Sequence, residues 1–348
     1  MERKEITSWN DIENIKTDLL RGIYSHGFEN PSPIQQKAIL PALDKKDLIA
    51  QAQSGTGKTG SFTVTALQLI NTDENKTQVL IMSPTRELST QIFSVLNNIG
   101  CHMDGLKTHL LVGGNSIDKD IVSLRDKPHI IVGCPGRVHD MIRRNKLNAQ
   151  DLNMMIIDEA DEMLSSGFKE QVYNIFQFLK SDIQVALYSA TLPPEVEELA
   201  GKFMRDPEKI LVKSEALTLE GIKQYYVAVD NDSIKYDTLK DLYNCISVAQ
   251  SIIYCNSIRR VEDLANAMIQ DGFAVSSIHG KMTHEERKEA FQNFKSGSTR
   301  VLISSNLTAR GIDVQQVSTV INFDIPKDVH TYIHRIGRSG RYGRKGTA

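Results

Sequence analysis

Residues 47–59 read DLIAQAQSGTGKT, an apolar run that passes through a glycine-rich turn into a lysine and a threonine. A short run without alternation of polar and apolar residues is typical of a strand that is buried on both faces. Glycines directly after such a strand, with a polar start to the next segment, favour a turn into a helix. The stretch therefore predicts a strand, a loop and a helix in an α/β domain with a parallel sheet.

Similar apolar runs recur along the chain, and amphipathic segments such as RELSTQIFSVLNNI separate them. The predicted strands of the first half are 47–52, 78–82, 129–133, 154–158 and 184–189; those of the second half are 224–229, 251–255, 273–278, 300–305 and 319–323. Between the two series, residues 212–221 are polar and lack an apolar face, so we predict a linker there. The pattern predicts two α/β domains, residues 1–211 and 222–348, each with a mainly parallel sheet flanked by helices.

Composition excludes several classes of protein. Of 348 residues, 40% are hydrophobic and 24% are charged, which is typical of a soluble protein with proper cores. The net charge of −2 means that any nucleic-acid site must be a local patch. Four widely spaced cysteines without a C-x-x-C pair indicate buried thiols in a reducing compartment. No apolar run reaches the roughly 18 residues of a membrane span, and the N-terminus does not resemble a signal peptide, so we expect a cytosolic or nuclear protein.

Residues 52–59, AQSGTGKT, fit the phosphate-binding pattern G-x-x-x-x-G-K-[ST] except that Ala52 replaces the first glycine. Glycines let backbone N–H groups turn toward a phosphate, while Lys58 adds a point charge and Thr59 offers a hydroxyl to Mg²⁺. A glycine-rich turn with a purely structural role rarely places Lys-Thr at a helix start. The predicted phosphate-binding residues are Ser54, Gly55, Thr56, Gly57, Lys58 and Thr59.

Residues 153–164 read NMMIIDEADEML, so a strand that looks buried ends in a cluster of carboxylates. Their repulsion is costly unless a cation, a ligand or solvent compensates for it. One explanation is a strand that emerges into water and starts a helix with an acidic first turn. The phosphate loop favours another: Mg²⁺, held by Thr59 and Asp158 partly through water, supplies the cation. Glu159 would then orient and deprotonate the attacking water, whereas Glu162 can be simply solvated.

A phosphate loop combined with DEAD at residues 158–161 resembles the DEAD-box RNA helicases, and further motifs follow in order along nearly the whole chain. LTLEGIKQYYVAV, residues 217–229, is similar to the branch of translation initiation factor four-A. The resemblance implies two RecA-like domains of the P-loop type, of which the first binds ATP and Mg²⁺. The family continues after HRIGRSGR, residues 334–341, with a strand and a helix, so either the chain is trimmed there or the second domain is unusually short; if the strand is missing, the second sheet loses an edge strand.

The resemblance also implies the nucleotide contacts. Within GFENPSPIQ, residues 27–35, Phe28 would stack on adenine and Gln35 would bond to its edge, and Trp9 is the family's upstream aromatic residue. In the second domain, Asp313 would meet the ribose and two arginines would reach the γ-phosphate. The implied catalytic set is Lys58, Asp158, Glu159, Arg338 and Arg341.

The implied RNA contacts come from PTREL, GG and CPGR at residues 84–88, 113–114 and 134–137. Loops at strand ends offer N–H groups, hydroxyls and arginines to phosphates, so the contacts would follow the shape of the RNA strand and its 2′-hydroxyls. SAT, residues 189–191, and the start of HRIGRSGR would couple hydrolysis to strand separation. The implied RNA-binding residues are Pro84, Thr85, Arg86, Gly113, Gly114, Pro135, Gly136, Arg137, Arg287 and Ser305, and the implied coupling residues are Ser189, Thr191, His334 and Arg335.

Three positions depart from the family pattern: Cys134 replaces a usual threonine, His284 a frequent glutamine and Asn306 an aspartate. The changes at Cys134 and Asn306 remove a hydroxyl and a charge. His330 and His334 have a spacing that can chelate a metal, but no glutamate follows the first histidine as a zinc protease would need. The basic tail after residue 341 can add unspecific contacts with nucleic acid.

Together these motifs predict a monomeric RNA-dependent ATPase whose domains close on ATP·Mg²⁺ and single-stranded RNA and open short duplexes locally. Scaffold proteins of the initiation-factor kind are expected partners. An ATP-gated RNA clamp with little unwinding activity is the alternative that the motifs leave open. A DNA-directed motor is a third hypothesis, and the motif loops argue against it because they resemble RNA readers rather than DNA readers.

Overall fold

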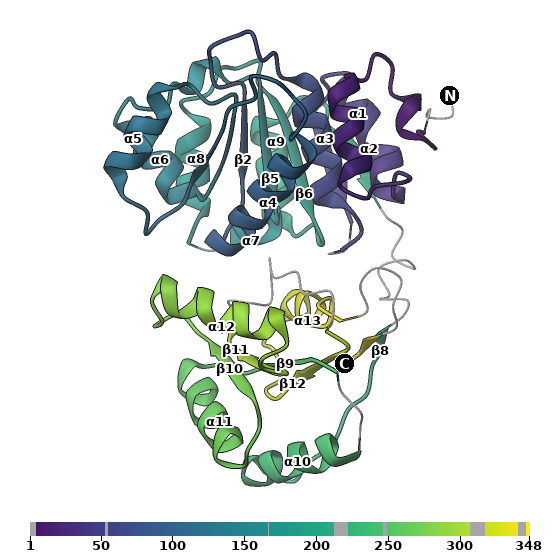
Figure 1. Cartoon of the computed structure of the whole chain (residues 1–348), viewed down its shortest axis with the longest axis vertical. Coiled ribbons are helices and arrows are strands. Elements are labelled where there is room, and N and C mark those ends of the chain that lie inside the picture. The colour runs from purple at the N-terminus through teal and green to yellow at the C-terminus, as the bar shows by residue number, and fades with distance from the viewer. Residues whose placement is uncertain are drawn as a thin grey trace. The chain divides into compact units, whose positions relative to one another are not determined.

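The structure is a computed structural model, and it describes residues 5–52, 55–165, 167–211, 222–245, 249–306, 317–339 and 346–348. Contacts divide the chain into two compact units, Met1–Ser214 and Glu215–Ala348, each with its own sheet and helices (Figure 1). The predicted linker, residues 212–221, lies outside the described residues. Within the described ranges, no helix has both the length and the apolar character needed to cross a membrane.

The first unit is built on a seven-stranded parallel sheet of order β3-β4-β2-β5-β6-β1-β7. Its strands are β1 (Leu48–Gln51), β2 (Val79–Met82), β3 (Thr108–Leu111), β4 (Ile130–Gly133), β5 (Met154–Asp158), β6 (Gln184–Ser189) and β7 (Glu208–Leu211). The five predicted strands of this half are confirmed. The sequence did not reveal β3 and β7, which are the two edge strands and are only partly buried.

Helices cover both faces of this sheet. They are α1 (Thr17–Ser25), α2 (Pro33–Leu43), α3 (Lys58–Leu69), α4 (Arg86–Ile99), α5 (Ile117–Arg125), α6 (Pro135–Arg143), α7 (Ala160–Ser165), α8 (Lys169–Phe176) and α9 (Pro194–Phe203). Val79 and Ile81 of β2 join a core cluster with α1 to α4, whereas Leu80 and Met82 join a second cluster with α5 to α9. Because successive strand residues point to opposite faces, both must be apolar, which explains the unalternated runs.

The second unit has a six-stranded sheet of order β10-β11-β9-β12-β13-β8. Its elements are β8 (Ile222–Lys223), α10 (Lys235–Cys245), β9 (Ser251–Tyr254), α11 (Ile258–Gln270), β10 (Val275–Ile278), α12 (His284–Ser296), β11 (Val301–Ser304), β12 (Thr319–Asn322), α13 (Val329–Ile336) and β13 (Gly346–Thr347). Four of the five predicted strands are confirmed here. All the pairings in this sheet are parallel in the part of the chain that the structure describes.

One expectation for the second unit is wrong, and another strand follows the HRIGRSGR motif. Residues 224–229 form no strand; β8 ends just before them, and Tyr225, Tyr226 and Val227 are exposed. Their apolar composition suggested a buried strand, but little of the unit covers them. The sheet also has a strand after residues 334–341, because β13 pairs in parallel with both β12 and β8. Thr347 aligns with Thr319 of β12, so this strand lies inside the sheet and not at its edge.

Candidate active site

The predicted site residues of the first unit gather at one edge of its sheet. In parallel sheets, ligands bind beyond the carboxyl ends of the strands. The phosphate loop, DEAD and SAT lie at the ends of β1, β5 and β6, which are neighbours in the order β5-β6-β1. PTREL, GG and CPGR follow β2, β3 and β4, which are neighbours in the order β3-β4-β2. The strand order therefore places the predicted nucleotide residues and the predicted RNA residues side by side.

The phosphate loop has a backbone that only glycine adopts readily. Gly55 and Gly57 have φ values of 84° and 104°, in the left-handed region. Gly57 is the N-cap of α3, so Lys58 and Thr59 occupy its first turn, where backbone N–H groups remain free to bind an anion. Gln53 and the predicted contact Ser54 lie outside the described residues. The loop is thus a cradle for phosphate at the N-terminus of a twelve-residue helix.

The acidic end of β5 lies against this cradle. Lys58 Nζ is 3.4 Å from Glu159 Oε1, and both side chains are buried. Burial raises the pKa of Asp158 to about 7, although the nearby Lys58 ammonium lowers it. A desolvated carboxylate of this kind is stabilised by a cation, and the Asp158 carboxylate with the Thr59 hydroxyl offers the hard oxygen ligands that Mg²⁺ prefers. The residues present therefore fit a magnesium-bound polyphosphate.

The third carboxylate of the cluster connects DEAD to SAT. The backbone N–H of Asp161 donates to Ser189 Oγ at 3.3 Å, and Thr191 Oγ1 donates to Asp161 Oδ2 at 2.6 Å. All three residues are buried. Asp161 was not among the predicted site residues, although its place in the acidic cluster of residues 158–162 pointed to a role in the site. These two hydrogen bonds connect the end of β5 directly to the loop after β6.

The predicted adenine-reading segment is anchored by Trp9. The Trp9 indole N–H donates to the Phe28 carbonyl at 2.9 Å, and the two rings are stacked with centroids 6.3 Å apart. Trp9 has no exposed surface, so it positions Phe28 and does not itself offer a face to a ligand. The contacts of Trp9 therefore connect it to the predicted nucleotide site through Phe28.

Gln35 joins this segment to the phosphate loop. Its Oε1 accepts from the Ser32 N–H at 2.7 Å in a capping box of α2, and its Nε2 donates to the Gly57 carbonyl at 3.1 Å. A Cβ on Gly60 would lie 2.5 Å from Gln35 Nε2 and 2.7 Å from Phe28 Cε2. Gly60, which the sequence analysis did not single out, thus permits the close packing of Phe28 and Gln35 on α3.

Trp9→Phe is expected to weaken nucleotide binding by roughly two- to tenfold, because it removes the hydrogen bond that holds Phe28. Titration with a fluorescent ATP analogue measures the dissociation constant. Turnover at saturating ATP should change little, since Trp9 is remote from the acidic end of β5. Phe176→Leu is the control, because Phe176 belongs to the core cluster on the other face of the sheet. Equal weakening by both variants would indicate general destabilisation and contradict the positioning role.

Three loops meet in the predicted RNA half. Thr85 is the N-cap of α4 and accepts from the Leu88 N–H at 3.2 Å, which leaves Arg86 at the first position of the helix. Added Cβ atoms on Gly113 and Gly114 would lie 3.0 Å and 2.6 Å from guanidinium nitrogens of Arg86. Gly114 has a φ of 91°, which favours glycine, and the absence of side chains at both positions lets the arginine lie against the backbone of the next loop.

The CPGR loop after β4 contacts the segment after β2 through a thiol and two hydroxyl groups. Ser89 Oγ is 2.6 Å from Ser83 Oγ and 3.4 Å from Cys134 Sγ. Burial raises the pKa of the Cys134 thiol to about 11, so the thiol stays protonated at neutral pH. Cys134 is the N-cap of α6 but makes no side-chain cap. Pro135 and Gly136 follow in the first turn of α6, where their position matches the prediction.

Arg137 is held by a carboxylate that the sequence analysis missed. It forms an ion pair with the buried Asp120 and donates to the Asn115 carbonyl at 2.9 Å. His109 Nε2 lies 3.1 Å from the same carboxylate. No sequence motif marks Asp120, since it lies mid-helix among other charged residues. These contacts hold the guanidinium of Arg137 between the GG loop and α5, where its predicted phosphate contact would begin.

Within the described residues of the second unit, the acceptors that hold the Arg335 side chain are all neutral. The buried guanidinium donates to Oδ1 of three asparagines and to one backbone carbonyl, and it lies 5.2 Å from the Tyr254 ring centroid. The acceptors are Asn256 Oδ1 at 2.8 Å, Asn306 Oδ1 at 3.0 Å from Nε, Asn322 Oδ1 at 3.1 Å and the Asp324 carbonyl at 2.8 Å. Desolvation lowers the pKa of Arg335 from its ordinary value. We call these four acceptors the asparagine cage. Asn306, one of the departures from the family pattern, is thus one of the acceptors that hold the Arg335 guanidinium.

The other predicted residues of this unit lie near the carboxyl ends of its strands or on its helices. Ser305 follows β11, and Arg287 is in the first turn of α12, where its Nε donates to the Thr283 carbonyl at 3.4 Å. Arg338 follows α13 and donates from Nε to the His334 carbonyl at 3.3 Å. Asp313 and Arg341 lie outside the described residues, as does the side chain of His330, so the histidine-pair alternative has no described geometry.

The sequence is similar to known helicase families over most of its length. The profile of the DEAD/DEAH box helicase family matches residues 32–199, and that of the helicase conserved C-terminal domain matches residues 234–343. The ATP-dependent RNA helicase eIF4A of Coccidioides immitis is 52% identical over 344 residues, which cover 99% of this chain and 86% of that protein. The eIF4A of Kluyveromyces lactis is 53% identical over 345 residues, with 99% and 87% coverage.

Solved structures agree. The Saccharomyces cerevisiae Dbp5 bound to RNA and ADP BeF3 has a TM-score of 0.91 at 34% identity, covering 99% of this chain and 88% of that one. Mss116p bound to single-stranded RNA and AMP-PNP has a TM-score of 0.89 at 27% identity, with 100% and 75% coverage. The resemblance inferred from the sequence motifs and the prediction of two RecA-like domains are both confirmed.

Proposed function

Because the chain belongs to the DEAD-box family of ATP-dependent RNA helicases, which hydrolyse ATP, we propose that it binds ATP and single-stranded RNA together and separates short RNA duplexes. The observation that carries this proposal is the shared sheet edge of the first unit. Lys58, Asp158 and Glu159 converge at one half of that edge, while Arg86, Gly113 and Gly114 converge at the other. One rigid sheet can therefore position both ligands.

In the proposed site, the N-terminus of α3 and Lys58 bind the phosphates of ATP, while Phe28 and Gln35 bind adenine. Thr59 and Asp158 hold Mg²⁺, which supplies positive charge to the β- and γ-phosphates. Glu159 orients the attacking water and accepts its proton. Arg338, with Arg341 and Asp313, serves the same nucleotide from the second domain. This use of both domains would make ATP binding and domain closure the same event.

The loops after β2, β3 and β4 are proposed to bind the RNA backbone through N–H groups, hydroxyls and arginines, with Arg287 and Ser305 contributing from the second domain. Ser189, Thr191 and Asp161 would link the γ-phosphate end of the site to the RNA half. Structures of two similar proteins support a joint requirement, since Dbp5 is bound to RNA with ADP BeF3 and Mss116p to single-stranded RNA with AMP-PNP.

The high identity to fungal eIF4A proteins supports a place in translation initiation, in the cytoplasm, with initiation-factor-like scaffold proteins as partners and a monomeric catalytic chain. A nuclear role is the alternative that belongs to the same branch. A proposed linker at residues 212–221 would leave the domains at 1–211 and 222–348 free to reorient.

ATP turnover measured with and without single-stranded RNA tests the function. Turnover should be low alone and rise when RNA is added, and a labelled strand of a short duplex should be released in the presence of ATP. RNA-stimulated closure with no released strand would instead favour the ATP-gated clamp. Single-stranded DNA of equal length is the matched competitor, and stimulation by DNA as strong as that by RNA would contradict the RNA preference.

A further inference from the structure

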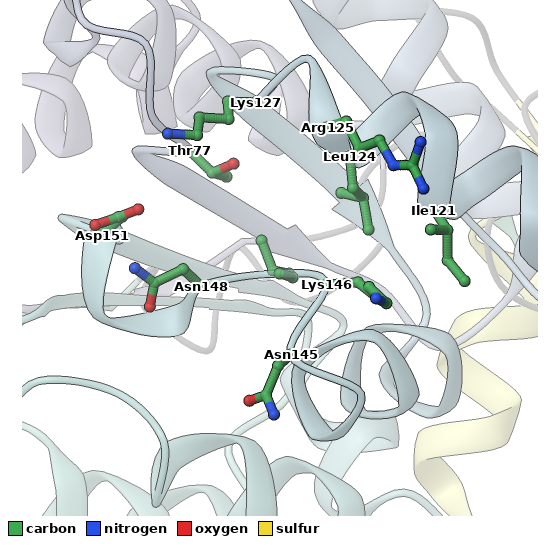
Figure 2. Close-up of a pocket in the computed structure, with 10 residues that line it drawn as sticks. Thr77, Ile121, Leu124, Arg125, Lys127, Asn145, Lys146, Asn148 and Asp151 are labelled. Atoms are coloured by element: carbon green, nitrogen blue, oxygen red, sulfur yellow. The ribbon is translucent and has the colours of Figure 1, made fainter.

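A hollow of about 250 Å³ lies in the first unit, at the amino ends of the strands (Figure 2). Thr77 and Lys127 precede β2 and β4, and the remaining walls come from the C-terminal half of α5 and the segment after α6. The phosphate loop, DEAD and the RNA loops all lie at the opposite, carboxyl ends of these strands. A ligand in the hollow would therefore compete with neither ATP nor RNA.

The hollow has an apolar floor and a cationic rim. Leu124 and Leu147 are buried in its base, and Ile121 is half-buried beside them. Arg125, Lys127 and Lys146 are exposed around the rim, with one carboxylate, Asp151. In the described part of the chain, none of these three cations forms an ion pair. Two asparagines, Asn145 and Asn148, complete the polar lining and offer amide donors and acceptors.

The helix ends explain only part of this charge. A cation in the last turn of a helix stabilises its dipole, which accounts for Arg125 at the end of α5. That effect fades beyond the last turn, yet Lys127 lies two residues past α5, and Lys146 lies past the end of α6. Arg143 and Arg144 already stand at the end of α6, where both pair with Asp140. The helix dipoles therefore account for Arg125 but not for Lys127 and Lys146.

The lining selects among classes of ligand. Pockets for small molecules enclose most of their ligand, whereas the rim of this hollow is exposed to solvent. Single-stranded nucleic acid binds by stacking its bases on aromatic rings, and the lining contains no aromatic residue. An apolar floor within a ring of cations instead complements a peptide that joins an apolar side chain to nearby carboxylates.

We propose that this hollow docks an acidic segment of a partner protein. An apolar side chain of the segment rests on Leu124 and Leu147, and flanking carboxylates meet Arg125, Lys127 and Lys146. Figure 2 shows Asp151 and Asn148 on one side of the hollow and Arg125 and Ile121 on the other. Because Asp151 repels carboxylates, the most acidic part of the segment lies toward Arg125. The docked partner leaves the nucleotide and RNA edge open.

Selection of displayed peptides on the full chain tests this site. Enriched peptides should carry an apolar residue flanked by Asp or Glu. They should bind Lys127→Glu/Lys146→Glu more weakly by roughly ten- to a hundredfold, because each reversal turns an attraction into a repulsion. Arg21→Glu/Lys209→Glu reverses two exposed cations of the first unit outside the hollow and should leave peptide binding unchanged.

Each other outcome overturns the proposal. Selection that enriches no acidic peptides contradicts the proposal, as do enriched peptides that bind the hollow variant and the control variant equally well. A loss of affinity for single-stranded RNA confined to Lys127→Glu/Lys146→Glu would assign the cations to nucleic acid instead. The melting temperature and the RNA-stimulated ATP turnover of both variants should match those of the unaltered chain, which separates a docking defect from a folding defect.

Discussion

Replacement of Glu159 by glutamine is expected to lower ATP turnover by roughly 10²- to 10⁴-fold, the contribution typical of a positioned general base. The amide keeps the volume of the side chain but cannot take a proton from water. ATP should still bind, because the cradle of α3, Lys58 and Asp158 remains. The variant should therefore accumulate as a complex with ATP and RNA. Single-turnover hydrolysis and titration with a fluorescent ATP analogue measure the two quantities separately.

Glu162→Gln is the matched control, since it removes a carboxylate of the same cluster, three residues further along, in the first turn of α7. It should retain turnover close to that of the unaltered chain. Glu159 and Lys58 are a buried pair, so thermal unfolding must show that Glu159→Gln still folds. Turnover that persists in folded Glu159→Gln would exclude Glu159 as the base.

Arg338→Ala is expected to lower hydrolysis by roughly 10³- to 10⁵-fold, the range known for arginine fingers in other nucleotide hydrolases. In the proposed role, charge develops on the γ-phosphate as the bond breaks, and the Arg338 guanidinium would stabilise that charge. Affinity for ATP should fall little, because the phosphate loop, Phe28 and Gln35 belong to the first unit. Steady-state kinetics should show a reduced kcat with nearly unchanged KM for ATP.

Arg338→Lys should recover only part of the activity, since an ammonium keeps the charge but loses the planar fork. Arg300→Ala removes an exposed arginine of the same unit and should leave turnover unchanged. If Arg338→Ala raised KM instead and left kcat intact, the residue would bind the ground state and the arginine-finger role would fail.

Apolar strands buried on both faces were the part of the fold that the sequence predicted well. Residues 154–158 and 184–189 match β5 and β6 at both ends, because every residue there is buried. Burial of both faces makes composition and structure agree. Strands β3 and β7 were not predicted because edge strands are partly exposed and mix polar with apolar residues. Residues 224–229 show the opposite error: they are apolar, yet exposed.

The candidate site, like the fold, was predicted only in part from the sequence. Motif spacing predicted that Lys58, Asp158 and Glu159 would meet, because strand ends of a parallel sheet share one edge. Asp120 and Asp161 were not assigned roles, since an ion pair between α5 and α6 and a hydrogen bond between two loops depend on packing that no local pattern encodes. Trp9 was predicted to bind the nucleotide, and the structure adds that its indole N–H donates to the Phe28 carbonyl.

The asparagine cage around Arg335 has a consequence for the conditions under which the enzyme works. Its acceptors are amides and one peptide carbonyl, none of which gains or loses a proton between mildly acidic and alkaline solution. Mild acidification would therefore leave the anchoring of α13 intact. The position of Arg338, which directly follows α13, would be preserved as well. A carboxylate in place of Asn306 would instead form an ion pair with Arg335, which would hold the pKa of that carboxyl below its ordinary value, so that only strong acid would weaken the anchoring.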